Sequence, residues 1–117
     1  MGVENFEDKN KAIEKEERRL FKIYKDIEEK RKKTIEGLIQ RAAFLRITLA
    51  ELEEDINIYG VTEWFSQGDQ EPYLRERPTA RIYNSMNTSY QKIIKQLTDL
   101  LPKEEPPRGG GDEFDNF

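Results

Sequence analysis

The chain has 117 residues, of which 38% are charged and 35% hydrophobic, and its formal net charge is −4. It contains no cysteine and no histidine, which excludes disulfides, thiolate nucleophiles, zinc sites built on those residues and histidine-based catalysis. We therefore expect one domain that lacks the side chains most enzyme classes use, with no cofactor and no metal. The longest apolar run, residues 42–45, is far too short for a membrane span, and the acidic start lacks a signal-peptide core, so we expect a soluble cytosolic protein.

The small net charge hides a strong separation of charge along the chain. Residues 18–46 contain ten basic and four acidic residues, whereas residues 47–72 contain seven acidic residues and no basic one. A folded chain can gather such a basic stretch on one face, so an anionic partner remains compatible with a net charge of −4.

Residues 6–59 have the composition of helix, with no proline, one glycine and many Glu, Lys, Arg, Leu and Ile residues. The apolar residues of the first part form a narrow stripe: Ile13, Leu20, Ile23, Tyr24 and Ile27. The second part has a fuller face with steps of three and four, and it is the best candidate for the core. Its members are Ile35, Leu38, Ile39, Ala42, Leu45, Leu49, Leu52, Ile56 and Tyr59.

Local signals predict that this helical half is interrupted. Thr48 followed by Glu51 has the pattern of a capping box, which predicts a new helix near Leu49. An earlier break is indicated by four consecutive basic residues, 30–33, which suit a helix C-terminus, and by Thr34, which suits the cap of the next helix. One continuous long helix is the alternative. Gly60 is expected to end the helical half.

Residues 60–77 are rich in turn-forming residues and are expected to form a long central loop, in which residues 61–65 could be a short extended piece. A third helix is predicted after Arg77, with Pro78 in its first turn. Its apolar face comprises Ile82, Tyr83, Met86, Tyr90, Ile93, Ile94, Leu97, Leu100 and Leu101.

The predicted fold class is all-α: three to four helices in a hairpin or bundle, with a long central loop and a disordered C-terminal tail. Residues 1–103 are expected to form the helical domain, and residues 104–117 the acidic tail, in which prolines and glycines forbid regular structure. Phe114 and Phe117 are isolated aromatic residues in this tail.

The basic stretch, residues 18–46, is the first functional signal, because a helix would display its positive charges as a stripe that suits phosphate groups. The alternative is that these residues form ion pairs with acids four positions away, such as Glu14 with Arg18 or Glu29 with Lys33. The candidate DNA-binding residues are Arg18, Lys22, Lys25, Lys30, Arg31, Lys32 and Lys33, followed by Arg41 and Arg46.

The apolar faces of the predicted helices are the second signal. Three elements of this size can bury this apolar surface only in part, and self-assembly would bury the rest. A bundle that satisfies itself is the alternative. The candidate oligomer interface comprises Leu38, Leu45, Ile82, Met86, Tyr90, Ile93 and Leu97.

Two weaker signals lie in the second half of the chain. Rings and guanidinium groups alternate between Tyr73 and Tyr83, a pattern that suits either nucleic-acid stacking or a loop that packs its rings on the bundle. Four acidic residues between Glu51 and Asp55 lack the spacing of a calcium loop.

Several strings resemble the short terminase small subunits of tailed bacteriophages. They are GLIQRAAFLRITLAEL (37–52), DIN (55–57) with Gly60, IYNSM (82–86) followed by Tyr90, and QLTDLLP (96–102). The resemblance covers residues 19–103. It implies a non-enzymatic subunit that assembles into a ring in the cytoplasm of the infected host, binds double-stranded viral DNA at the packaging start site, and recruits and regulates the large terminase subunit.

One further expectation and two rival functions accompany this interpretation. Phe114 and Phe117 are expected to dock on the large subunit, with a purely solvating tail as the alternative. A structural helical adaptor or scaffold component of phage head assembly, without DNA binding, is the alternative function. A nuclease that uses carboxylates and Mg²⁺ would need those carboxylates gathered in a pocket.

Overall fold

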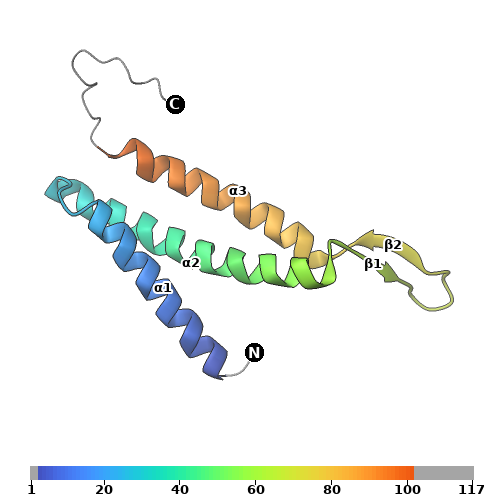
Figure 1. Cartoon of the computed structure of the whole chain (residues 1–117). Coiled ribbons are helices and arrows are strands. Elements are labelled where there is room, and N and C mark those ends of the chain that lie inside the picture. The colour runs from blue at the N-terminus through green and yellow to red at the C-terminus, as the bar shows by residue number, and fades with distance from the viewer. Residues whose placement is uncertain (1–2, 102–117) are drawn as a thin grey trace, which may run out of the picture.

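The computed structural model describes residues 3–101, which form three helices and a two-stranded sheet (Figure 1). The elements are α1 (Val3–Ile23), α2 (Glu29–Tyr59), β1 (Thr62–Phe65), β2 (Tyr73–Glu76) and α3 (Pro78–Asp99). The expectations for the tail, including Phe114 and Phe117, fall outside the described residues. The mostly helical prediction is confirmed, but the two strands make the all-α assignment wrong.

Helix α2 runs without interruption through 31 residues, so the predicted break at Thr48 is wrong. Leu49 is buried, and Thr48 itself is half-buried with a hydroxyl oxygen that has no hydrogen-bond partner in the described part of the chain. Burial of the apolar face against the other helices outweighs a capping box, which contributes only about 1 kcal/mol.

The turn before α2 spans residues 24–28, so α2 begins upstream of the predicted cap at Thr34. Tyr24 donates its main-chain N–H to the carbonyl of Phe21, and Ile27 donates to the carbonyl of Tyr24, which closes a tight reversal. Tyr24 is buried and Ile27 packs against the core, so apolar anchoring rather than a cap places this turn.

Strands β1 and β2 form an antiparallel hairpin where a long loop was predicted. Thr62 pairs with Glu76 and Phe65 with Tyr73, while Gly68 in the connecting loop has a φ of +59°. The short extended piece predicted at residues 61–65 corresponds to β1, but its partner strand was missed. The hairpin projects from the end of the molecule where α2 stops and α3 starts (Figure 1).

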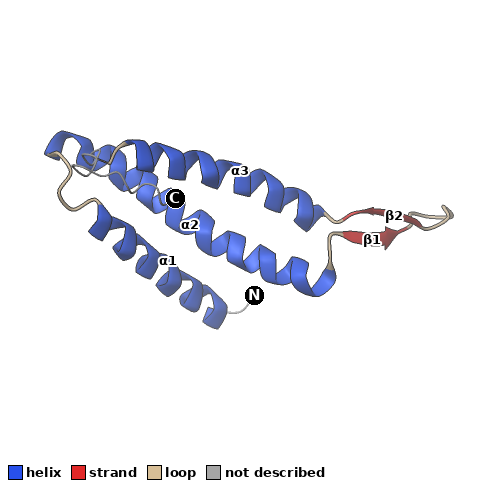
Figure 2. Cartoon of the chain, turned by 45° about the horizontal axis from the view of Figure 1, so that its top comes forward, coloured by secondary structure: helices blue, strands red, loops and turns tan. Residues whose placement is uncertain are grey.

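Helix α3 begins at Pro78, as predicted, and runs antiparallel to α2. Helix α2 lies between α1 and α3 (Figure 2), and it packs on both. The core lies where all three helices meet, near the α1–α2 turn, and consists of Leu20, Tyr24, Ile35, Ile39, Ala42 and Leu97. The molecule is elongated, with principal extents of 70, 38 and 22 Å.

Candidate functional site

The α1–α2 turn gathers most of the predicted DNA-binding residues at one end of the molecule. The end of α1, the turn and the first turns of α2 all lie there, and residues 18–33 contain eight basic and three acidic residues. We call this region the basic end and define it by six exposed side chains: Lys22, Lys25, Lys30, Arg31, Lys32 and Lys33. Arg18, also exposed, lies on α1 before the last turn of that helix.

Ion pairing accounts for little of this positive charge. Arg31 pairs with Glu28 at 3.7 Å and Lys32 with Glu29 at 3.5 Å, both at a spacing of three residues. None of the pairs predicted at a spacing of four is present within residues 3–101. All four side chains are largely exposed, and such pairs contribute no more than about 1 kcal/mol. Most of the basic end therefore stays available to an anionic ligand.

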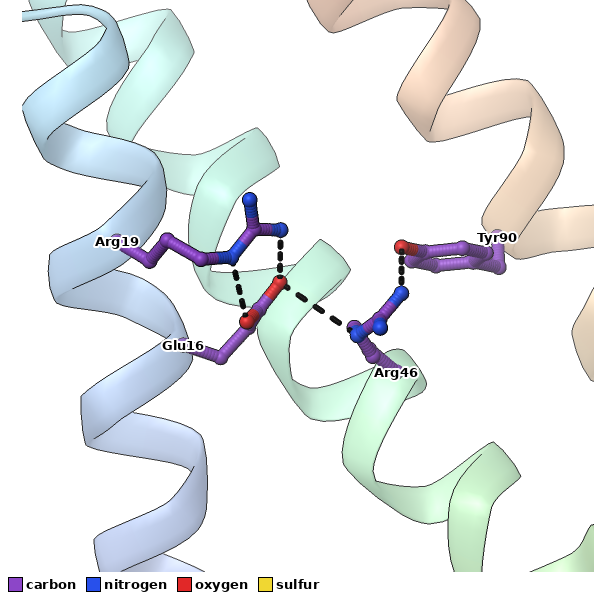
Figure 3. Close-up of polar contacts among 4 residues, drawn as sticks. All are labelled: Glu16, Arg19, Arg46 and Tyr90. Atoms are coloured by element: carbon purple, nitrogen blue, oxygen red, sulfur yellow. Dashed lines mark hydrogen bonds and ion pairs between the residues drawn. The ribbon is translucent and has the colours of Figure 1, made fainter.

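Arg46 lies away from the basic end, in a polar network that joins all three helices (Figure 3). Glu16 of α1 accepts hydrogen bonds from Arg19 Nε at 3.0 Å and Nη2 at 2.6 Å, and Arg46 Nε of α2 lies 3.9 Å from Glu16 Oε2. Arg46 also donates to the hydroxyl of Tyr90 on α3 at 3.5 Å. Arg46 thus connects helices, but its side chain is still 57% exposed, and its contact with DNA stays a prediction.

The electrostatics of Glu16 follow from this geometry. Its side chain is only 10% exposed, yet the hydrogen bonds from Arg19 lower the pKa of its carboxyl group against the opposing effect of burial. The positive charges of Arg19 and Arg46 lower that pKa further. Glu16 is thus ionised at neutral pH.

Arg41, the other secondary candidate for DNA binding, is exposed on α2 and lies outside both this network and the basic end.

The basic end also contains a pocket of about 450 Å³ between the end of α1 and the start of α2. Its apolar lining comes from Phe21, Tyr24, Ile27 and Ile35, and burial raises the pKa of the Tyr24 hydroxyl. The charged side chains that line it are those of Lys25, Lys32, Lys33 and Glu36. The pocket is therefore apolar inside and net positive around its charged groups.

The opposite end of the molecule exposes a group of large apolar side chains around the hairpin. Trp64 is 72% exposed and Leu74 is 54% exposed, and these two residues pair across the strands. Exposed apolar groups of this size are typical of an interaction surface. We call this group the hairpin end; it comprises Ile58, Tyr59, Val61, Trp64, Leu74 and Ile82.

The second face of the hairpin is satisfied internally. Arg75 forms an ion pair with Glu63 at 2.7 Å, and its guanidinium lies 3.5 Å from the centre of the Phe65 ring. Tyr73 contacts Phe65 edge to face. The rings of Phe65 and Tyr73 thus pack within the hairpin, and the expected packing of these rings on the bundle is not what the structure has.

The acidic residues of α2 bind separate partners. Glu51 pairs with Lys9 at 2.9 Å, and Asp55 pairs with Arg77 at 2.8 Å. Glu53 accepts a hydrogen bond from the Tyr83 hydroxyl. Within residues 3–101, no three or more Asp or Glu side chains are grouped so that they could hold a metal ion.

The predicted oligomer interface is used largely inside the chain. Leu97 is 2% exposed and belongs to the core, so its assignment to an interface between subunits is corrected. Leu38, Tyr90 and Ile93 pack against that core, while Leu45 and Met86 are half-buried. Ile82 is exposed and belongs to the hairpin end. The rest of the hairpin end was not predicted as an interface; its signal in the sequence is a group of apolar residues around Trp64 and Leu74 that has no helical period.

Comparison with models of protein families, with curated proteins and with solved structures gives no match for this chain. None of the helices described here is long and apolar enough to cross a membrane.

Proposed function

We propose that this chain is a DNA-packaging subunit of the terminase small-subunit type, which assembles with itself, binds double-stranded viral DNA and recruits the large subunit. The resemblance of residues 19–103 to that family suggests the class of protein. The observation that carries the DNA-binding part is the basic end, where six exposed basic side chains come from one turn and the helix ends that flank it.

Two physical properties suit the basic end to phosphate groups. Lysine and arginine side chains at this end are long and exposed, so they can reach a backbone with little desolvation. The N-terminus of α2 lies in the same place, and Glu28 at its N-cap makes no side-chain hydrogen bond to the free N–H groups of the first turn. Such N–H groups and the helix dipole favour an anion.

Self-assembly is supported by the hairpin end, which exposes apolar side chains far from the basic end. A ring needs a heterologous interface, in which the hairpin end of one subunit contacts a different surface of the next. Repeating the basic end around a ring would multiply weak phosphate contacts into tight binding.

The decisive experiment measures binding of the full chain to double-stranded DNA by fluorescence anisotropy over a series of salt concentrations. In the test variant, Lys30, Arg31, Lys32 and Lys33 are all replaced by Gln. If each contacts a phosphate, affinity falls for all DNA sequences alike, and the slope of log K against log salt decreases by about 3–4 per subunit.

The matched control removes four exposed charges outside the predicted set, by the substitutions Lys11→Gln, Lys15→Gln, Lys92→Gln and Lys95→Gln. This control has the same net charge as the test variant, so it separates local contacts from the general field of the protein. Equal losses in both variants would refute the assignment to the basic end.

The second candidate function is the structural adaptor, which the exposed apolar hairpin end favours by itself. An adaptor would assemble with itself without binding DNA. The same anisotropy series separates the two functions, because an adaptor shows no saturable binding even at the lowest salt concentration.

A further inference from the structure

We infer that the pocket at the basic end binds residues 112–117 of the same chain, an acidic segment that contains Phe114 and Phe117. The pocket has a volume of about 450 Å³, which falls within the range of roughly 300–1,000 Å³ typical of ligand sites. Its apolar interior and its lysines require a ligand that is both aromatic and acidic.

The composition of the segment matches both requirements. Residues 112–117 read DEFDNF, with three acidic residues, two phenylalanines and no basic residue. A phenyl ring can pack against Phe21 and Ile27, while the neighbouring carboxylates lie near Lys25, Lys32 and Lys33. Glu36, the one carboxylate in the lining, is outnumbered by these lysines.

The path of the chain places this segment within reach of the pocket. Helix α3 ends at the basic end, where Leu100 and Leu101 line a small cavity together with Ile27. Ile27 also lines the pocket itself, so the two cavities share a wall. Phe114 lies thirteen positions after Leu101, and this stretch can span up to about 43 Å, far more than a neighbouring cavity demands.

Tethering favours this occupant over a second copy of the chain. The hairpin end of another molecule also offers aromatic rings near acidic residues, but it must arrive from solution. A short tether gives its own segment an effective concentration in the millimolar range.

This binding would have a consequence for DNA that rests on the proposed function. Lys25, Lys32 and Lys33 belong both to the pocket and to the basic end, so a docked tail and a DNA phosphate compete for the same charges. While residues 112–117 occupy the pocket, the protein would bind DNA more weakly, until another ligand displaces this segment.

Docking is tested on the full chain by paramagnetic NMR. The sequence has no cysteine, so Asn116→Cys allows a nitroxide label at a single position. Docking broadens the amide signals of residues 21–36 and leaves those of residues 62–76 sharp. The additional substitutions Phe114→Ala and Phe117→Ala abolish the broadening, whereas the control substitutions Pro106→Ala and Pro107→Ala in the same tail preserve it.

Three results would overturn the inference. One is the absence of selective broadening near the pocket, and a second is broadening that persists without the two phenylalanines. The third comes from a mixture of isotope-labelled chains without nitroxide and nitroxide-labelled chains without isotope: broadening there would show that the tail of another molecule fills the pocket.

Competition with DNA is tested separately, with the same pair of phenylalanine substitutions in the unlabelled chain. They leave the net charge unchanged and are expected to raise DNA affinity by about three- to tenfold, the factor for a site covered roughly 70–90% of the time. Docking without any change in DNA affinity would refute the competition. Absence of DNA binding in both proteins would refute the proposed function and leave the NMR result standing.

Discussion

Glu16 is the one buried charged residue among those whose burial the structure describes, and its contacts make a specific prediction. The substitution Glu16→Gln removes the charge that holds Arg19 and Arg46 between the helices, while the shape of the side chain is kept. We expect the free energy of unfolding at pH 7 to fall by about 1–2 kcal/mol, because hydrogen bonds to a charged group are lost while both arginines remain solvated. Urea unfolding measures this change.

The pH dependence of the same pair of proteins provides a second readout. Because folding lowers the pKa of Glu16 below its ordinary value of about 4.5, its contribution is full above that pH and is lost as the pH falls through the folded-state pKa. The difference in stability between wild type and Glu16→Gln should therefore shrink below about pH 4.5. Glu14→Gln, an exposed neighbour on the same helix, serves as the control and should change little at either pH.

Leu97 tests whether its apolar face is used within the chain. The substitution Leu97→Ala should lower the free energy of unfolding by about 2–5 kcal/mol, because it leaves a cavity among Leu20, Ile35 and Ile39. Ile82→Ala, at an exposed position of α3, should change it by less than about 1 kcal/mol. Both values come from urea unfolding. If Leu97→Ala left the stability unchanged and abolished only self-association, Leu97 would belong to the interface between subunits instead.

At the scale of elements, a glycine inside α2 and the glycine that follows this helix should respond to alanine in opposite directions. Gly60 follows the helix with φ +81° and ψ −174°, a conformation that only glycine adopts readily, so Gly60→Ala should cost about 1–3 kcal/mol. Gly37 lies inside the helix, where an added Cβ would meet only Arg41 Nη1 at an ordinary 3.7 Å. Gly37→Ala should therefore stabilise the protein by about 0.5–1 kcal/mol. Thermal unfolding monitored by circular dichroism measures both, and equal effects would contradict this account.

The elements also show why only part of the fold was predictable. Pro78 fixed the start of α3 because proline constrains the backbone locally. The helix break predicted at Thr48 was wrong for the converse reason. Burial of Leu49 and its neighbours, which depends on residues distant in sequence, overrides the local capping pattern. Strand β2 was missed because it is only four residues long and ends in Glu76, a poor strand former, while Arg75 is held by contacts with Glu63 and Phe65 across the hairpin.

The candidate site was predictable to a similar degree. The basic residues 30–33 were evident from the sequence, because a run of like charge is visible without a structure. Arg46 was expected on the same surface, but its contacts with Glu16 and Tyr90 depend on two other helices. The pocket was invisible because Phe21 and Ile35 become neighbours only when the chain reverses at residues 24–28.

At the scale of the whole molecule, the basic end and the hairpin end lie at opposite ends of the long axis. The basic end lies at one extreme, whereas residues 51–77 around the hairpin contain eight acidic and two basic residues. Helix α2 joins the two and, with 31 residues, is about 46 Å long. Assembly through the hairpin end would therefore leave the basic end accessible to DNA, because the two surfaces do not overlap.

This separation makes a final prediction about assembly. The substitutions Trp64→Ser and Leu74→Ser remove the two cross-strand side chains that the hairpin exposes, so they should abolish self-association without loss of helix content. Neither side chain supports the helical core, which lies near the opposite end. Analytical ultracentrifugation at micromolar concentration measures the oligomer, and circular dichroism measures the helix content.

The control for this prediction is Phe44→Ser, which removes an exposed ring from the middle of α2 and should leave the oligomer intact. If the basic ends bind DNA together, the monomeric double variant should also bind DNA more weakly, although all its basic residues are present. A wild-type chain that is monomeric at these concentrations would contradict the assembly proposal. If the double variant still forms an oligomer, assembly does not depend on contacts of the hairpin. The interface would then consist of other exposed residues on the helices.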